Sequence, residues 1–74
     1  MSFQPRTTDE LVRIALAGGA IEMDVAARTT DDLVRIALAA GKGGGTWVFK
    51  GLYARTTDDL VRISLAAKGN VRFV

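Results

Sequence analysis

Three arginines, Arg6, Arg28 and Arg55, have the type and spacing that best fit a binding site in this sequence. Each directly precedes the start of an expected helix, where unpaired backbone N–H groups favour negative charge. In a parallel sheet the strand ends and the helix starts meet at one edge, and open sheets bind ligands there. The arginines therefore predict an arginine-lined edge. We interpret it first as a structural ladder to neighbouring aspartates and second as an anion site.

A glycine-rich segment over residues 41–46, Gly-Lys-Gly-Gly-Gly-Thr, has the composition of a phosphate-binding loop. Such a loop follows a strand and opens a helix, and it ends in Gly-Lys-Ser/Thr. This segment instead follows an expected helix, precedes an expected strand and lacks that ending. We therefore interpret it as a flexible connection and not as a nucleotide site.

Side chains suited to catalysis are scarce in this composition. The chain contains no cysteine and no histidine, so the thiol nucleophile, the commonest general base and the commonest metal ligand are missing. Glu22 and Asp24 share one face of a strand, but nothing places a proton donor beside them. The hydroxyl of Ser64 is expected to bond the carbonyl one helical turn back. The sequence thus predicts a protein that is not an enzyme and needs no cofactor or metal.

An internal repeat provides the elements that position these residues. The phrase Arg-Thr-Thr-Asp-Asp/Glu-Leu-Val-Arg-Ile-Ala/Ser-Leu-Ala starts at Arg6, Arg28 and Arg55, and ten of its twelve positions are the same in all three copies. Repetition at this spacing indicates stacked units that share one core. We expect one domain over residues 1–74.

Each copy of the repeat carries the signals that start a helix. A threonine followed three residues later by an acid predicts a capping box, and these pairs are Thr7 with Glu10, Thr29 with Asp32, and Thr56 with Asp59. Another acid lies four residues before an arginine, which favours ion pairs within each helix; these are Asp9 with Arg13, Asp31 with Arg35, and Asp58 with Arg62. Glycines mark the ends. We expect helices over residues 8–18, 30–41 and 57–68.

Short segments of strand character lie between these helices, over residues 21–25, 46–52 and 71–73, and Phe3 indicates an opening strand. Short right-handed connections make such strands parallel neighbours and place the helices on one face. We therefore predict an α/β fold of three tandem βα repeats plus a closing strand. It would form a parallel four-stranded sheet with all helices on one face, in a short solenoid-like architecture. The other face must be polar or covered by another molecule.

The direction of Trp47 and Phe49 stays open at this stage. Alignment of the residues that stand three before each repeat, Phe3, Val25 and Leu52, points both aromatic side chains away from the helices. Their size and apolarity favour the opposite direction, into the core. On the open sheet face, with Tyr53 at its rim, they would form an interaction patch. Gly51 is a candidate bulge that reconciles the two arrangements.

Two strings, residues 28–37 and residues 68–73, resemble small uncharacterised bacterial proteins that repeat the Thr-Thr-Asp-Asp-Leu phrase. The resemblance covers most of the chain and implies a bacterial origin and a repeat architecture. It carries no site residue with it. The leucine-rich horseshoe is the nearest general architecture, although the Leu-x-x-Leu-x-Leu-x-x-Asn signature is missing.

A small protein-interaction or assembly module is the function that the sequence favours. Apolar helix flanks and unpaired strand edges predict self-association, as a homodimer through the terminal strand near Phe73 or through the open sheet face, or by stacking of the ends. The alternative is a weak nucleic-acid or polyanion binder that uses the arginine-lined edge, although a net charge of +2 argues little for it. The absence of a bilayer-length apolar run and of a secretory leader predicts a cytoplasmic protein without membrane contact. The candidate binding residues are Arg6, Arg28, Arg55, Trp47, Phe49, Tyr53 and Phe73.

Overall fold

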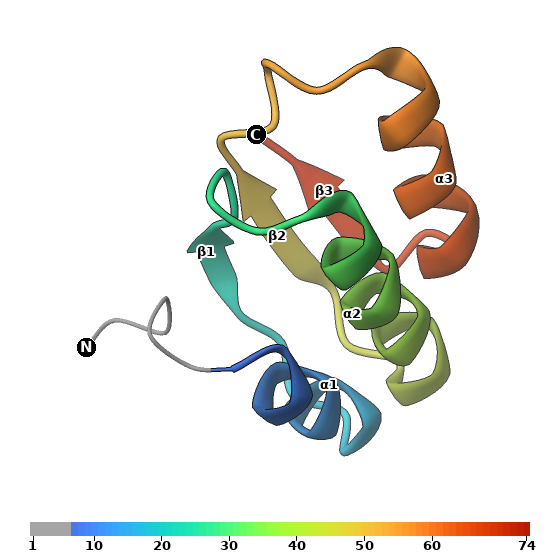
Figure 1. Ribbon diagram of the computed structural model, residues 1–74. Coiled ribbons are helices and arrows are strands. Elements are labelled where there is room, and N and C mark those ends of the chain that lie inside the picture. The colour runs from blue at the N-terminus through green and yellow to red at the C-terminus, as the bar shows by residue number, and fades with distance from the viewer. Residues whose placement is uncertain (1–6) are drawn as a thin grey trace.

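A computed structural model describes residues 7–74 as three helices alternating with three strands (Figure 1). In chain order these elements are α1 (Thr8–Leu16), β1 (Glu22–Asp24), α2 (Thr30–Gly43), β2 (Trp47–Lys50), α3 (Thr57–Ala67) and β3 (Val71–Phe73). The strands form a parallel sheet in the order β1-β2-β3. Helix α2 packs between α1 and α3, in one layer that covers one face of the sheet. The chain is therefore a mixed α/β protein.

The predicted four-stranded sheet is wrong. The described residues form a three-stranded sheet and start with a helix, so the unit that repeats among them is a helix followed by a strand. The predicted count of four included an opening strand at Phe3. Phe3 and Arg6, on which that count and part of the arginine-lined edge depended, lie outside the described residues.

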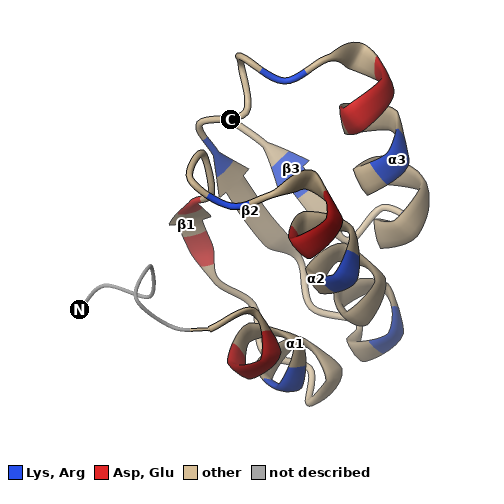
Figure 2. Cartoon of the chain, viewed as in Figure 1, with Lys and Arg blue, Asp and Glu red and all other residues tan. Residues whose placement is uncertain are grey.

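Helix starts follow the caps that the sequence indicates. The hydroxyl oxygens of Thr7, Thr29 and Thr56 each accept a hydrogen bond from the backbone N–H three residues later, at 3.2 Å. Within the described residues only Glu10 completes the capping box, with its carboxylate accepting from the Thr7 N–H at 3.1 Å. Aspartate at the same place in α2 and α3 is one methylene shorter. Figure 2 shows acidic residues at the start of each helix, where the helix dipole favours them.

Helix ends depart from the expected positions by one or two residues. Helix α1 stops at Leu16, whereas α2 continues through Gly41 to Gly43 and ends at Gly44, which adopts the left-handed conformation with φ 89°. The glycines of α2 serve close packing. A Cβ at Gly43 would lie 1.7 Å from the carbonyl oxygen of Ala15, at the end of α1. The glycine-rich segment is therefore a helix end fitted against its neighbour.

Trp47 and Phe49 both point into the core and are fully buried. Their rings meet edge to face, with centroids 6.4 Å apart at 77°, and the indole Nε1–H of Trp47 donates to the Gly19 carbonyl at 3.0 Å. Leu52 is buried as well, although it lies three residues after Phe49. Gly51, with φ 85°, supplies the change of direction between them. Both alignments considered from the sequence are thus partly right. The alternation of inward and outward side chains is interrupted at Gly51, so Phe49 and Leu52 both point inward.

The sheet face opposite the helices is polar. Glu22, Asp24 and Lys50 are exposed there, and the ammonium group of Lys50 lies 3.0 Å from the Glu22 carboxylate. Neighbouring strands thus bring opposite charges together on the uncovered face. In the described part of the chain, no helix has the length and apolarity that a membrane span requires.

Candidate functional site: the rungs between units and the two helix flanks

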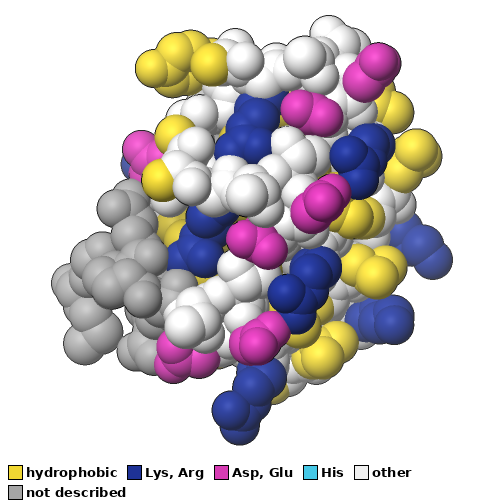
Figure 3. All heavy atoms as spheres, viewed as in Figure 1, with side chains coloured by type: hydrophobic (Ala, Val, Ile, Leu, Met, Phe, Trp, Pro, Cys, Tyr) yellow, Lys and Arg dark blue, Asp and Glu magenta, His cyan; other side chains and the backbone are white. Residues whose placement is uncertain are grey.

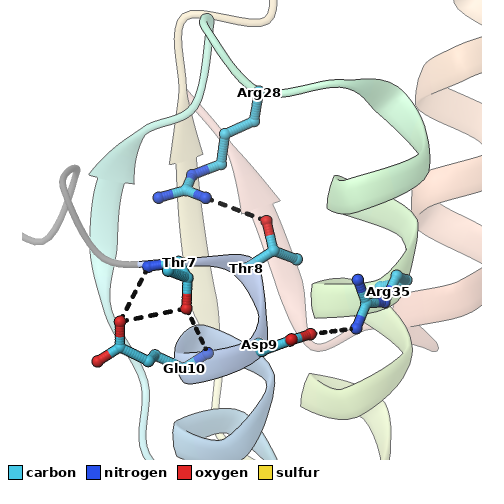
Figure 4. A network of polar contacts seen from close by, with 6 residues as sticks. All are labelled: Thr7, Thr8, Asp9, Glu10, Arg28 and Arg35. Atoms are coloured by element: carbon cyan, nitrogen blue, oxygen red, sulfur yellow. Dashed lines mark hydrogen bonds and ion pairs between the residues drawn. The ribbon is translucent and has the colours of Figure 1, made fainter.

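Two arginines of the predicted edge, Arg28 and Arg55, make hydrogen bonds to the repeat unit before them. Arg28 turns back toward the unit before it, and its Nη1 donates to the Thr8 hydroxyl at 3.2 Å (Figure 4). Arg55 repeats this contact one unit later, donating to the Thr30 hydroxyl at 2.6 Å. The structure brings these arginines onto threonine hydroxyls, and not onto the aspartates that the sequence suggested.

Arg55 makes two further contacts that hold the loop between β1 and α2. Its Nη2 donates to the Ala26 carbonyl at 3.3 Å and also to the carbonyl of Arg28. A guanidinium with three protein acceptors on two segments acts as a clamp between units. Three of its five N–H donors are thus used within the fold.

A second set of contacts between units joins the exposed sides of the helices. We call each of these arginine–aspartate ion pairs a rung. Arg35 of α2 pairs with Asp9 of α1 at 2.6 Å, and Arg62 of α3 pairs with Asp31 of α2 at 3.2 Å. Figure 4 shows Arg35 reaching across to α1. The expected ion pairs within each helix are therefore wrong, because the acids pair with the arginine of the next helix. Sequence reasoning missed this role of Arg35 and Arg62, and the signal that would have found it is the repeat, which sets equivalent helices side by side.

Arg55→Met is expected to destabilise the fold by about 2 kcal/mol, because the Ala26 and Arg28 carbonyls and the Thr30 hydroxyl lose a charged donor. Arg62→Met removes only an exposed ion pair and should cost about 0.5 kcal/mol. Urea denaturation followed by tryptophan fluorescence measures both. Equal losses for the two variants would contradict the clamp role of Arg55.

The aromatic candidates do not form one site. Trp47 and Phe49 are core residues, whereas Tyr53 is 94% exposed in the loop between β2 and α3. Phe73 lies on β3 opposite Phe49 and is 37% exposed. The interaction patch that these side chains would form on the open sheet face is therefore absent from the described structure. The Phe73 side chain lies on the same face of the sheet as Phe49 but is less buried.

Burial of equivalent positions shows which helix flanks are covered. The middle helix α2 buries Ile36, Ala37 and Ala39. In α1 the counterparts of Ile36 and Ala39 are Ile14, which is half-buried, and Ala17, which is exposed. In α3 the counterpart of Ala37 is Ser64, which is exposed. Among the described residues, the outer helices α1 and α3 are thus less buried than α2, each on the side that faces away from α2.

We name these two surfaces, on the outer sides of α1 and α3, by their residues. The α1 flank consists of Glu10, Arg13, Ile14 and Ala17, which line a shallow hollow. The α3 flank consists of Asp58, Val61, Ser64 and Leu65, and its valine and leucine are 48% and 72% exposed. The Ser64 hydroxyl donates to the Leu60 carbonyl at 2.8 Å, one turn back as expected, so it needs no outside partner.

Groups that could hold a metal ion, with three or more acidic, histidine or cysteine side chains together, are not found among residues 7–74. The arrangement offers two apolar flanks with charged rims, and Arg28 and Arg55 of the predicted edge are hydrogen-bonded within the fold. Comparison with protein families, curated proteins and solved structures finds no match to this chain.

Proposed function

We propose that this chain is a protein-interaction module that assembles with other protein chains through its α3 flank. The observation that carries the proposal is the difference in burial between equivalent apolar positions. Val61 and Leu65 are 48% and 72% exposed, whereas their counterparts in α1 are more covered: Val12 is half-buried and Leu16 is 51% exposed. The repeat thus carries, on α3, a helix-binding surface that nothing in the described chain covers.

Further apolar surface lies on β3, the strand that follows α3 and forms an edge of the sheet. Phe73 of β3 is in register with Phe49 of β2 and Met23 of β1, which are both buried. No described strand pairs with the outer edge of β3, so its backbone groups are open to an added strand. A partner that covers the α3 flank and this edge would bury apolar side chains and complete backbone hydrogen bonds together.

Binding of nucleic acid through the arginine-lined edge is less well supported. The Arg28 and Arg55 side chains each donate to protein acceptors. Exposed acids stand beside them at the helix starts, and these repel a phosphate backbone.

Leu65→Asp tests the proposal, because it places a charge in the centre of the α3 flank without touching the core. Sedimentation velocity of the purified chain should show an associated species that is lost in this variant, with association weakened on the order of 100-fold. Tyr53→Asp is the matched control, since Tyr53 is still more exposed but belongs to the loop between β2 and α3 and not to the helix. Association that survives Leu65→Asp, or that Tyr53→Asp abolishes equally, would overturn the proposal.

A further inference from the structure

We infer that the occupant of the α3 flank is the α1 flank of a second copy of this chain, in a head-to-tail contact that repeats the packing of one unit on the next. This inference rests on the proposed function and names its partner. The two flanks are the two sides of one helix–helix contact that the chain already makes twice. Their shapes and charges are therefore known from α1 against α2 and from α2 against α3.

The apolar part of the contact has a template inside the chain. Where α1 meets α2, Val12 and Leu16 of α1 line a shallow groove with Ala39 of α2. The α3 flank presents Val61 and Leu65 in place of Val12 and Leu16. The α1 flank presents Ile14 and Ala17 in place of Ile36 and Ala39, on the walls of its hollow. Docking the two flanks therefore brings together residue types that already meet where α1 packs on α2.

The centre of the α3 flank is compatible with being covered. Ser64 stands where Ala15 and Ala37 are fully buried. Its side chain is only slightly larger than alanine, and its hydroxyl already donates to Leu60. A second copy can thus cover Ser64 without leaving a donor unsatisfied.

The charged rim is complementary in the same direction. The rungs Asp9–Arg35 and Asp31–Arg62 each join the acid of one helix to the arginine of the next. Asp58 of α3 and Arg13 of α1 are the remaining members of this series, and neither has an ion-pair partner among the described residues. Figure 3 shows basic and acidic side chains alternating across the helix layer. A second copy placed head to tail would continue this order with an Arg13–Asp58 rung.

Such a contact joins two different surfaces, so every copy keeps one flank open. Contacts of this kind build rings when they close and filaments when they do not. A two-fold dimer joins a surface to itself and stops at two copies. The inference therefore predicts assemblies larger than a dimer.

The sharpest test uses two half-blocked variants. Ile14→Asp blocks the α1 flank and Leu65→Asp blocks the α3 flank, so each variant alone should be monomeric. Mixed at equal concentration, the open α3 flank of the first should bind the open α1 flank of the second, which gives a one-to-one dimer that cannot grow. Analytical ultracentrifugation measures the species, and circular dichroism checks that both variants fold. A mixture that stays monomeric, or a single variant that dimerises by itself, would overturn the head-to-tail contact.

A charge exchange gives an independent answer with exposed residues that the fold does not need. Arg13→Asp and Asp58→Arg should each weaken assembly about fivefold to tenfold, because like charges then meet at the rung. The double variant carrying both changes should assemble like the original chain, since its rung is only reversed. Failure of the double variant to recover would contradict the rung.

If Leu65→Asp abolishes association while Arg13→Asp leaves it unchanged, the proposed function stands and the head-to-tail partner falls. If the original chain does not associate at all, the proposed function falls first.

Discussion

Gly43→Ala is expected to unfold most of the protein at room temperature or to lower its stability by about 3 kcal/mol or more. The added Cβ would lie 1.7 Å from the Ala15 carbonyl oxygen and 2.9 Å from its carbonyl carbon. These are backbone atoms, so the clash is relieved only if α1 and α2 move apart. The gain in helix propensity from glycine to alanine, about 1 kcal/mol, is too small to offset that separation. Guanidinium denaturation followed by tryptophan fluorescence measures the loss.

Gly44→Asn is the matched control for this position. A Cβ at Gly44 meets nothing within 4 Å, and asparagine tolerates the left-handed conformation better than other side chains. We expect a loss within about 1 kcal/mol. If Gly43→Ala were as stable as Gly44→Asn, the close approach of α2 to the end of α1 would be wrong.

Trp47→Ala is expected to cost about 3 to 5 kcal/mol, which is a large part of the stability of a domain of this size. The indole is fully buried, packs against the edge of Phe49 and donates to the Gly19 carbonyl. Its removal leaves a cavity in the core and an unpaired carbonyl at Gly19, in the segment between α1 and β1. The tryptophan signal is lost in this variant, so the unfolding midpoint is followed by circular dichroism.

Tyr53→Ala tests whether this cost comes from burial and not from the loss of an aromatic ring. Tyr53 is 94% exposed, and its removal should change the unfolding free energy by less than about 0.5 kcal/mol. Similar losses for the two variants would show that Trp47 does not lie in the core.

Local signals in the sequence predict the helices and part of the core. The caps at Thr7, Thr29 and Thr56 form as expected, because each bond joins residues three apart and needs no distant partner. The inward direction favoured for Trp47 and Phe49 is confirmed. Their burial was predictable because no polar surface accommodates two large apolar rings as well as a core does.

Contacts between units were not predictable from one helix at a time. Asp9 has Arg13 on its own helix at favourable spacing, yet it pairs with Arg35, which lies 26 residues away in sequence. The side-by-side arrangement of α1 and α2 decides between the two arginines, and it depends on close packing at Gly43. The three short strands expected at residues 21–25, 46–52 and 71–73 all form within those ranges. The count of four strands failed because it included an opening strand at Phe3, outside the described residues.

The sequence predicted the residue types of the candidate site but not their contacts or their exposure. Arg28 and Arg55 drew attention as an edge, but their hydrogen bonds to Thr8 and Thr30 appear only in three dimensions. Apolar helix flanks were expected from the repeat, but residue types do not single out the α3 flank, because Val61 and Leu65 match the equivalent residues of the other copies. Only their exposure in the folded chain distinguishes them.

The mass of the original chain in solution, measured by light scattering over a range of concentrations, tests the central claim most directly. Absorbance at 260 nm is recorded at low and at high salt. We expect a mass that rises with concentration past twice that of one chain, with no nucleic acid bound. A monomer at every concentration, or a species that carries nucleic acid and loses it in salt, would contradict assembly through the two helix flanks.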